Sequence, residues 1–156
     1  MIERQNQLNK LIDGRMALDY TAFDLEPYFL IIDELPSLIG KMEKKQRDLF
    51  LDTLGTISQM GSGSGFFLIL IAQKLDAQVL PKKIQENMLN KIILGRASNQ
   101  TYMTAIDRAE DVPKKDYGKG EGIYIDDTMS KPRLVNFPHL KFIDDIERLD
   151  DVLVKE

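Results

Sequence analysis

Short apolar runs alternate with amphipathic stretches along the chain. Residues 28–32 and 66–71 are continuous apolar runs, as is typical of parallel strands that are buried on both faces. Between them, residues 41–60 place apolar side chains at helical spacing, which predicts a long amphipathic helix. Strands that alternate with helices indicate an α/β fold, and we expect three layers around a mostly parallel sheet.

The remaining pattern predicts shorter elements. Further helices are expected over residues 1–13, 82–90, 98–107 and 143–152. Further strands are expected over residues 91–94, 122–125 and 133–135, the last two as a hairpin at one edge. The glycine-rich stretch Gly61–Gly65 breaks the pattern and predicts a flexible connector between a helix and a strand.

Length and composition favour one soluble domain. The 156 residues suit a single domain over residues 1–156, and 43% of them are hydrophobic. There is no cysteine, and the polar N-terminus lacks the apolar core of a signal peptide. We therefore expect a cytoplasmic location, with any membrane tether of the full-length protein outside this segment. The net charge of −4 argues against a broadly basic nucleic-acid binder.

Polar side chains follow both apolar runs at the point where each predicted strand ends. Asp33 and Glu34 come directly after residues 28–32, and Gln73 follows the second run. In open parallel sheets, ligands bind outside the carboxyl ends of the strands. If these two strands are neighbours, their backbones lie about 4.8 Å apart. The acid pair and the amide would then face one crevice.

That combination suits nucleotide hydrolysis. Asp33 could hold Mg²⁺ through water, because magnesium keeps part of its hydration shell. Glu34 could polarise the attacking water, and the Gln73 amide could hydrogen-bond the γ-phosphate. Strand ends also meet solvent, so an acid pair can follow an apolar run without any function. The residues alone leave both interpretations open.

A phosphate-binding loop is missing from the sequence. Nothing matches G-x-x-x-x-G-K-[ST], and Gly61–Gly65 lacks a lysine and precedes a strand. By itself, this chain should bind a triphosphate weakly or not at all.

Two groups of basic residues are candidates for contact with DNA phosphates. They are Lys41, Lys44, Lys45 and Arg47 in the first group, and Lys82, Lys83 and Lys91 in the second. Acidic residues lie among them, so a solvated helix face explains them equally well. The DNA-binding residues stay unassigned. His139 has no partner of a metal site in the sequence, which favours a packing role.

Four segments in order resemble the C-terminal half of the FtsK/SpoIIIE motor domain, a RecA-like DNA translocase. PYFLIIDEL resembles its Walker B strand, and GFFLILIAQKL resembles the next core strand. ENMLNKIILGRASNQTYMTAID and GKGEGIYID resemble the following strand, helix and late turn. The resemblance covers about residues 1–150.

The resemblance implies an ATP-dependent translocase of double-stranded DNA that works as a homo-oligomeric ring with ATP and Mg²⁺. It matches Asp33 to the magnesium-linked aspartate, Glu34 to the catalytic glutamate and Gln73 to the sensor position. The family's Arg-Pro after the glutamine is Lys74-Leu75 here, and its late aspartate is Glu121. These departures indicate a divergent branch, such as the coupling proteins of mobile elements.

The part of the family's motor domain that contains the P-loop has no counterpart here, so we expect a fragment that is inactive alone. Such a fragment would expose a sheet edge and could dimerise through it. A non-enzymatic α/β interaction module remains the alternative function. The sequence does not choose among chromosome segregation, sporulation and conjugation.

Overall fold

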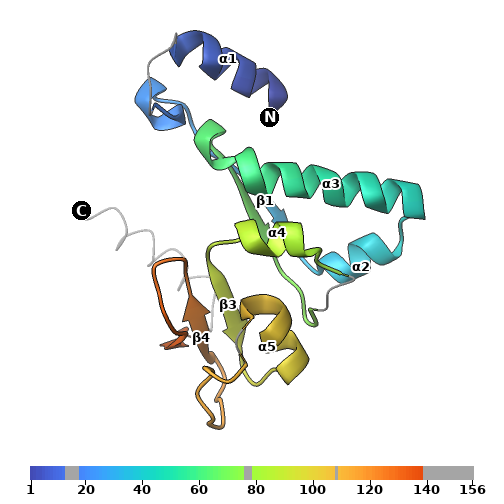
Figure 1. Ribbon diagram of the computed structural model, residues 1–156, viewed down its shortest axis with the longest axis vertical. Coiled ribbons are helices and arrows are strands. Elements are labelled where there is room, and N and C mark those ends of the chain that lie inside the picture. Colours follow the sequence, from blue (N-terminus) through green and yellow to red (C-terminus); the bar gives the residue numbers. More distant parts are fainter. Residues whose placement is uncertain (13–17, 76–78, 108, 139–156) are drawn as a thin grey trace.

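The computed structural model describes residues 1–12, 18–75, 79–107 and 109–138 (Figure 1). The helices are α1 (Ile2–Ile12), α2 (Leu35–Gly40), α3 (Lys44–Met60), α4 (Lys82–Asn87) and α5 (Asn99–Ile106), with short 3₁₀ turns η1 (Tyr20–Phe23) and η2 (Ser62–Ser64). The strands are β1 (Tyr28–Ile32), β2 (Phe66–Leu70), β3 (Lys91–Leu94), β4 (Glu121–Ile125) and β5 (Arg133–Asn136). The predicted α/β class is confirmed. The helix expected over 143–152, and His139, lie outside the described residues.

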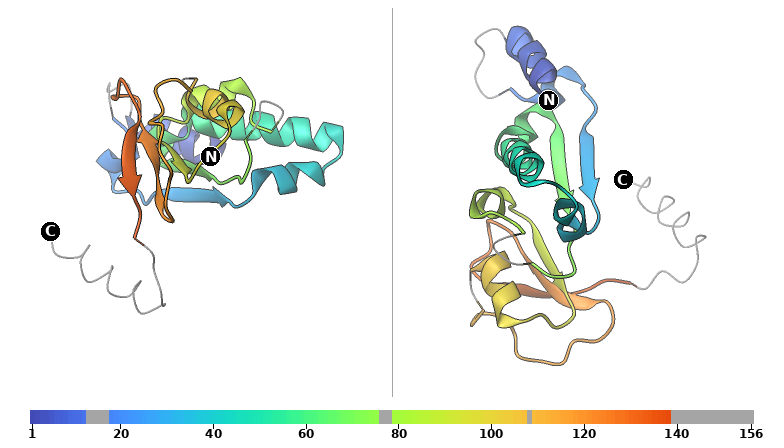
Figure 2. Two further views of the ribbon diagram at one scale, coloured as in Figure 1. Left: turned by 90° about the horizontal axis from the view of Figure 1, so that it is seen from below. Right: turned by 90° about the vertical axis from the view of Figure 1, so that its right-hand side faces the viewer.

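The two continuous apolar runs pair with each other. β1 and β2 are parallel and in step, from Tyr28 opposite Phe66 to Ile32 opposite Leu70. Helix α3 lies along one face of this pair, and the left view of Figure 2 shows the helix and the strands as separate layers. The core between them is formed by buried side chains from the end of β1, from α2, α3 and α4, and from the residue shortly before α4: Ile32, Leu35, Ile39, Leu54, Leu80 and Ile84. This core fixes the sheet against α3.

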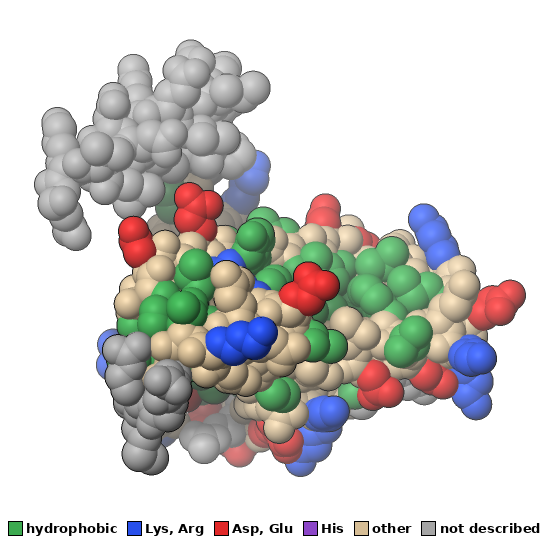
Figure 3. Space-filling view, turned by 90° about the horizontal axis from the view of Figure 1, so that it is seen from above, with side chains coloured by type: hydrophobic (Ala, Val, Ile, Leu, Met, Phe, Trp, Pro, Cys, Tyr) green, Lys and Arg blue, Asp and Glu red, His purple; other side chains and the backbone are tan. Residues whose placement is uncertain are grey.

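The opposite face of the β1–β2 pair is largely uncovered. Side chains alternate between the faces of a strand, so Phe29 and Ile31 point away from the core side that Ile32 faces. Phe29 is 59% exposed and Ile31 60% exposed. The space-filling view likewise shows hydrophobic side chains at the surface in several places (Figure 3). The expectations of a β1 buried on both faces and of three layers are therefore wrong for the described residues, because β1 pairs on one side only and the described helices leave this face of the pair uncovered (Figure 2).

The other three strands form a separate antiparallel sheet in the order β3–β4–β5. The β4–β5 hairpin is confirmed, but the expectation of one mostly parallel sheet is wrong. The cause lies in a pairing that the sequence pattern does not reveal: Gly122 lets β4 approach β3 closely. A Cβ atom at Gly122 would lie 2.3 Å from the Ile93 carbonyl oxygen. The missing side chain at Gly122 therefore permits the close pairing of β3 with the hairpin.

A second buried cluster lies between this antiparallel sheet and α5. It consists of Tyr102, Ala105, Ile106, Val112 and Ile123. Leu75 packs against both clusters and so connects the two halves. Among the described residues, no helix combines the length and apolar character needed to cross a membrane. The single-domain organisation stays a prediction.

The glycine-rich connector is a compact turn, which corrects the expectation of a flexible linker. Gly65 has a φ of 73°, and a Cβ atom there would lie 2.8 Å from the Tyr20 ring. A Cβ atom at Gly61 would lie 2.4 Å from the Ile57 carbonyl oxygen. These glycines allow α3 to turn directly into β2, with η1 packed against the turn.

The helix expected over residues 41–60 is confirmed as α3, which begins at Lys44, and a short additional helix, α2, precedes it. Helix α2 was not predicted, since Pro36 and the short length of the element hide it. The long helix α3 begins at Lys44, where Glu43 and Gln46 form a capping box that satisfies backbone N–H groups of the first turn. The acid pair is followed directly by the first turn of α2.

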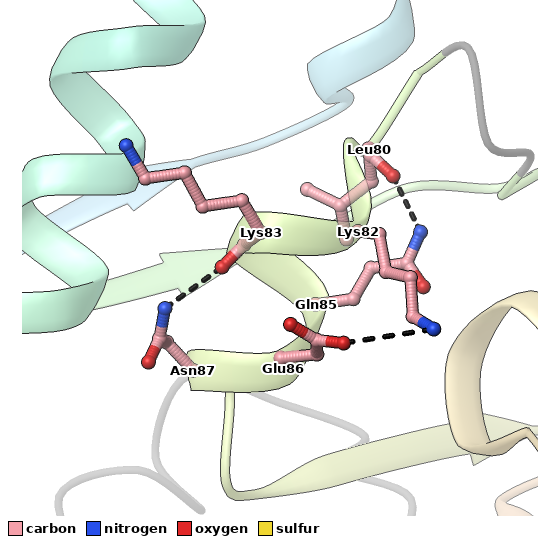
Figure 4. A network of polar contacts seen from close by, with 6 residues as sticks. All are labelled: Leu80, Lys82, Lys83, Gln85, Glu86 and Asn87. Carbon is pink, nitrogen blue, oxygen red and sulfur yellow. Dashed lines mark hydrogen bonds and ion pairs between the residues drawn. The ribbon is translucent and has the colours of Figure 1, made fainter.

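Polar contacts hold the short helix α4 together beside α3 (Figure 4). The Gln85 side chain donates to the Leu80 carbonyl oxygen, and Asn87 donates to the Lys83 carbonyl oxygen at 2.8 Å. The aliphatic part of Lys83 passes the position where Gly55 of α3 would bear a Cβ, with its Cε 3.5 Å from that point. The small residue therefore permits close packing of α4 on α3.

The uncovered face and free edge of β1 predict self-association of the 156-residue chain. We expect dimers or larger species whose proportion grows with concentration, because burying exposed apolar side chains is favourable. Ile31→Lys should shift the chain to the monomer, as measured by light scattering after size-exclusion chromatography. Leu49→Lys is the control, since Leu49 is 70% exposed on α3, away from this strand. A clean monomer of the unmodified chain at all concentrations would contradict the prediction.

Candidate functional site

The in-step pairing of β1 and β2 continues past the strands themselves. The Ile71 N–H donates to the Ile32 carbonyl oxygen at 2.9 Å, and the Leu35 N–H donates to the Ile71 carbonyl oxygen at 3.0 Å. Both chain segments therefore leave the sheet at the same level. The strand neighbourhood on which the predicted crevice depended is confirmed.

Glu34 occupies the turn between β1 and α2. Its φ of 56° and ψ of 62° lie in the left-handed region, which costs a residue with a side chain about 1–2 kcal/mol. The Glu34 carbonyl oxygen accepts from the Ser37 N–H at 3.0 Å, and the Leu35 side chain is fully buried beneath it. The buried leucine and the first turn of α2 hold the glutamate in this conformation. Strain of this kind is common at functional sites.

The carboxylate of Glu34 bridges the two strand ends. Its Oε2 atom accepts a hydrogen bond from the Gln73 backbone N–H at 3.2 Å. The structure thus brings together Glu34 and Gln73, two of the predicted site residues. The contact is made by the backbone of Gln73 and not by its side-chain amide. The Gln73 side chain is exposed, so its amide is accessible to a ligand.

Asp33 precedes this bridge and is exposed. Its carboxylate makes no hydrogen bond or ion pair with the described part of the chain, so its oxygens are available to a ligand. Within the described ranges, no group of three or more acidic or histidine side chains could hold a metal ion. Any Mg²⁺ held by Asp33 would therefore need most of its ligands from water and phosphate oxygens, which suits magnesium.

The basic residues predicted near α3 and α4 fall into two environments. Lys44, Lys45 and Arg47 lie in the first turns of α3, where the helix dipole disfavours cations. Both acidic and basic side chains stand at the end of the molecule where α3 begins (Figures 1 and 3). Lys82 pairs with Glu86 at 3.6 Å, and this pair is exposed. These contacts leave the solvated-face interpretation and the DNA-contact interpretation both open.

The late glycine turn is organised by Glu121. Its Oε2 atom accepts from the Gly118 N–H at 2.8 Å and pairs with Lys115 at 2.9 Å. The bond to Lys115 and the Gly118 N–H lower the pKa of the Glu121 carboxyl group. Gly120, with a φ of 81°, completes the turn. Glutamate therefore closes this turn where the resembled family has aspartate.

Sequence reasoning missed a cavity beside α5. It is lined by residues of the β3–α5 turn and of the segment from Ala109 to Tyr117, including Arg96 and Lys114. The Ser98 side chain caps α5 by accepting from the Thr101 N–H at 3.1 Å, as predicted. The adjacent lysines at 114 and 115 were the one sign of this cavity in the sequence. That they line the same cavity as Arg96 depends on the tertiary fold.

Comparison with known proteins supports this fold. No protein-family model matches the chain. The chain is 27% identical over 122 residues to the FtsK domain-containing protein YdcQ of Bacillus subtilis (strain 168), an overlap of 77% of this chain and 25% of that protein. The chain therefore spans about a quarter of this curated relative.

Two solved structures have a similar fold. One is the pCW3 conjugation coupling protein TcpA, in its monomer form with ATPγS, with a TM-score of 0.67 and 19% identity over 99% of this chain and 46% of that chain. The other is the cytoplasmic domain of the Thermomonospora curvata type VII secretion ATPase EccC, with a TM-score of 0.59 and 16% identity over 86% of this chain and 16% of that chain.

The chain thus shares the fold of part of the TcpA structure and of part of the EccC cytoplasmic domain. Its sequence similarity to an FtsK domain-containing protein confirms the resemblance to the FtsK/SpoIIIE motor domain.

The bridge between the strand ends predicts a local change in amide exchange. Glu34→Ala should speed hydrogen exchange at the Gln73 N–H by roughly fivefold, because a net hydrogen bond contributes about 1 kcal/mol. Glu34→Gln should preserve most of the protection, since its amide oxygen still accepts. Exchange can be followed residue by residue by NMR. Equal exchange in Glu34→Ala and the unmodified chain would show that the bridge is absent in solution.

Proposed function

We propose that this chain is the part of an ATP-dependent motor that completes its hydrolytic site, in a protein that moves double-stranded DNA. The main support is the Glu34 carboxylate, which joins the ends of β1 and β2 at 3.2 Å from the Gln73 N–H. The similarity to an FtsK domain-containing protein supports the motor class. The fold shared with a conjugation coupling protein favours conjugative transfer over chromosome segregation or sporulation.

In this proposal the three side chains have different tasks. The unpaired Asp33 carboxylate holds a water of the Mg²⁺ shell, which neutralises the phosphates. Glu34 releases the Gln73 N–H and accepts a proton from the attacking water, as a general base does. The exposed Gln73 amide hydrogen-bonds the γ-phosphate without adding charge.

In this proposal, the phosphate-binding part of the site is supplied from outside the 156 residues. Because no G-x-x-x-x-G-K-[ST] motif is present in the 156 residues, the phosphate cradle belongs to another segment or chain. The uncovered side of the β1–β2 pair leaves room for additional strands and layers. The active form is a homo-oligomeric ring around DNA on the cytoplasmic side.

Substitution of the proposed base in the full-length protein tests this function. Glu34→Gln should lower the rate of ATP hydrolysis by about 10²–10⁴-fold while ATP binding is retained, because the amide cannot take up the proton. Phosphate release and equilibrium nucleotide binding measure the two effects. Glu86→Gln is the control, since the Glu86 side chain is 61% exposed in the Lys82 ion pair.

Unchanged hydrolysis in Glu34→Gln would remove Glu34 from the mechanism. A full-length protein that neither binds nor hydrolyses ATP would instead favour the non-enzymatic interaction module.

A further inference from the structure

A cavity of about 690 Å³ lies beside the start of α5, in the half of the molecule that contains the antiparallel sheet. In Figure 1 this half is the lower part, where α5 lies beside β3. One wall is the turn from β3 into α5, and the other is the segment that follows α5. The cavity is separate from the ends of β1 and β2, and none of the tasks proposed for Asp33, Glu34 and Gln73 uses it.

The fold builds both walls firmly. Gly95 turns the chain out of β3 with a φ of 67°, and its N–H donates to the Glu121 carbonyl oxygen at 2.8 Å. The Tyr102 hydroxyl accepts from the Ala97 N–H at 3.1 Å, and Tyr102 is only 6% exposed. On the other side, the Tyr117 hydroxyl donates to the Pro113 carbonyl oxygen at 2.9 Å. These hydrogen bonds therefore fix the backbone on either side of the cationic residues Arg96 and Lys114.

Positive charge is in excess in this cavity. Arg96, Lys114 and Lys115 line it, against the single carboxylate of Asp116. Lys115 is already paired with Glu121 at 2.9 Å and lies 5.6 Å from the centre of the Tyr117 ring. Arg96 and Lys114 are exposed and make no ion pair with any described residue. Two cations thus line the cavity without an ion-pair partner among the described residues, and Asp116 is the one carboxylate in the lining.

The chemistry of the walls selects a phosphate ester. Guanidinium groups bind phosphate oxygens through two parallel hydrogen bonds, and lysine adds a point charge. The backbone N–H group of Asn99, which lines the cavity, has no partner within α5 because it belongs to the first turn of the helix, and it adds a donor at the same wall. The cavity is much larger than one phosphate group needs and is open to solvent. A ligand with several linked phosphates fits these features.

We propose that this cavity binds the phosphates of a nucleotide or of a nucleic-acid strand, with Arg96 and Lys114 as the principal contacts. The choice of these two ligands rests on the proposed function, because a DNA motor encounters both a nucleotide and a nucleic acid. The contact itself depends only on the cavity and its unpaired cations.

Equilibrium binding to the 156-residue chain tests the proposal. Fluorescently labelled ATPγS and a short labelled DNA duplex are titrated separately at low salt, and anisotropy is recorded. The variant Arg96→Gln with Lys114→Gln should weaken binding of the preferred ligand by roughly tenfold or more, because it removes two charge-assisted contacts. For the duplex, the logarithm of affinity falls linearly with the logarithm of salt concentration, with a slope of about 0.9 per phosphate contact. Loss of two contacts should therefore make this slope shallower by about two.

A matched control is Lys10→Gln with Arg133→Gln. It removes the same charge from exposed positions outside the cavity lining and should leave binding unchanged. Melting curves of both double variants verify that the fold is retained.

The outcomes separate the two sources of phosphate. Loss of duplex binding in the Arg96 and Lys114 variant assigns the cavity to the nucleic acid, and loss of ATPγS binding assigns it to the nucleotide. Binding of ATPγS alone would support the cavity while counting against DNA as its ligand. The proposal is overturned if neither ligand binds at low salt, or if affinity falls equally in the control variant.

Discussion

The in-step hydrogen bonding between β1 and β2 is the constraint on which the site depends. Because the strands are parallel and unshifted, the residues that follow each strand emerge at one level. The added bond from the Leu35 N–H to the Ile71 carbonyl oxygen extends this alignment to the turn itself. A shift of one residue would move every side chain to the opposite face and separate Glu34 from Gln73.

The core below the strands maintains this alignment. Ile32 ends β1 as its one buried residue, and Leu35 is fully buried at the start of α2. The left-handed backbone of Glu34 lies between these two anchors, so the strain at Glu34 is balanced by burial on both sides. The compact glycine turn before β2 serves the same purpose at the other end of the strand, because Gly65 brings the Tyr20 ring against the chain.

Local signals predicted much of the fold. The apolar runs gave β1 and β2, the Ser98 cap gave the start of α5, and the β4–β5 hairpin followed from short strands around a proline turn. The misses involve contacts between distant segments. The pairing of β3 with β4 depends on the missing side chain at Gly122, and the exposed face of β1 depends on which elements surround it.

For the site, too, local signals predicted some features, and contacts between distant segments determined the others. Strand-end chemistry singled out Asp33, Glu34 and Gln73, and the strand pairing that brings their backbones together is confirmed. That Glu34 would contact the backbone of Gln73 could not be predicted, because it depends on the left-handed turn. The approach of Arg96 to Lys114 was also hidden, since 18 positions and a helix separate them in the sequence.

The most direct test of the central claim is a structure of the full-length protein with Mg²⁺ and ATPγS bound. The account predicts the magnesium ion near Asp33 through a water molecule, and the γ-phosphate within hydrogen-bonding distance of the Gln73 amide. A nucleotide bound elsewhere, with the ends of β1 and β2 empty, would contradict it.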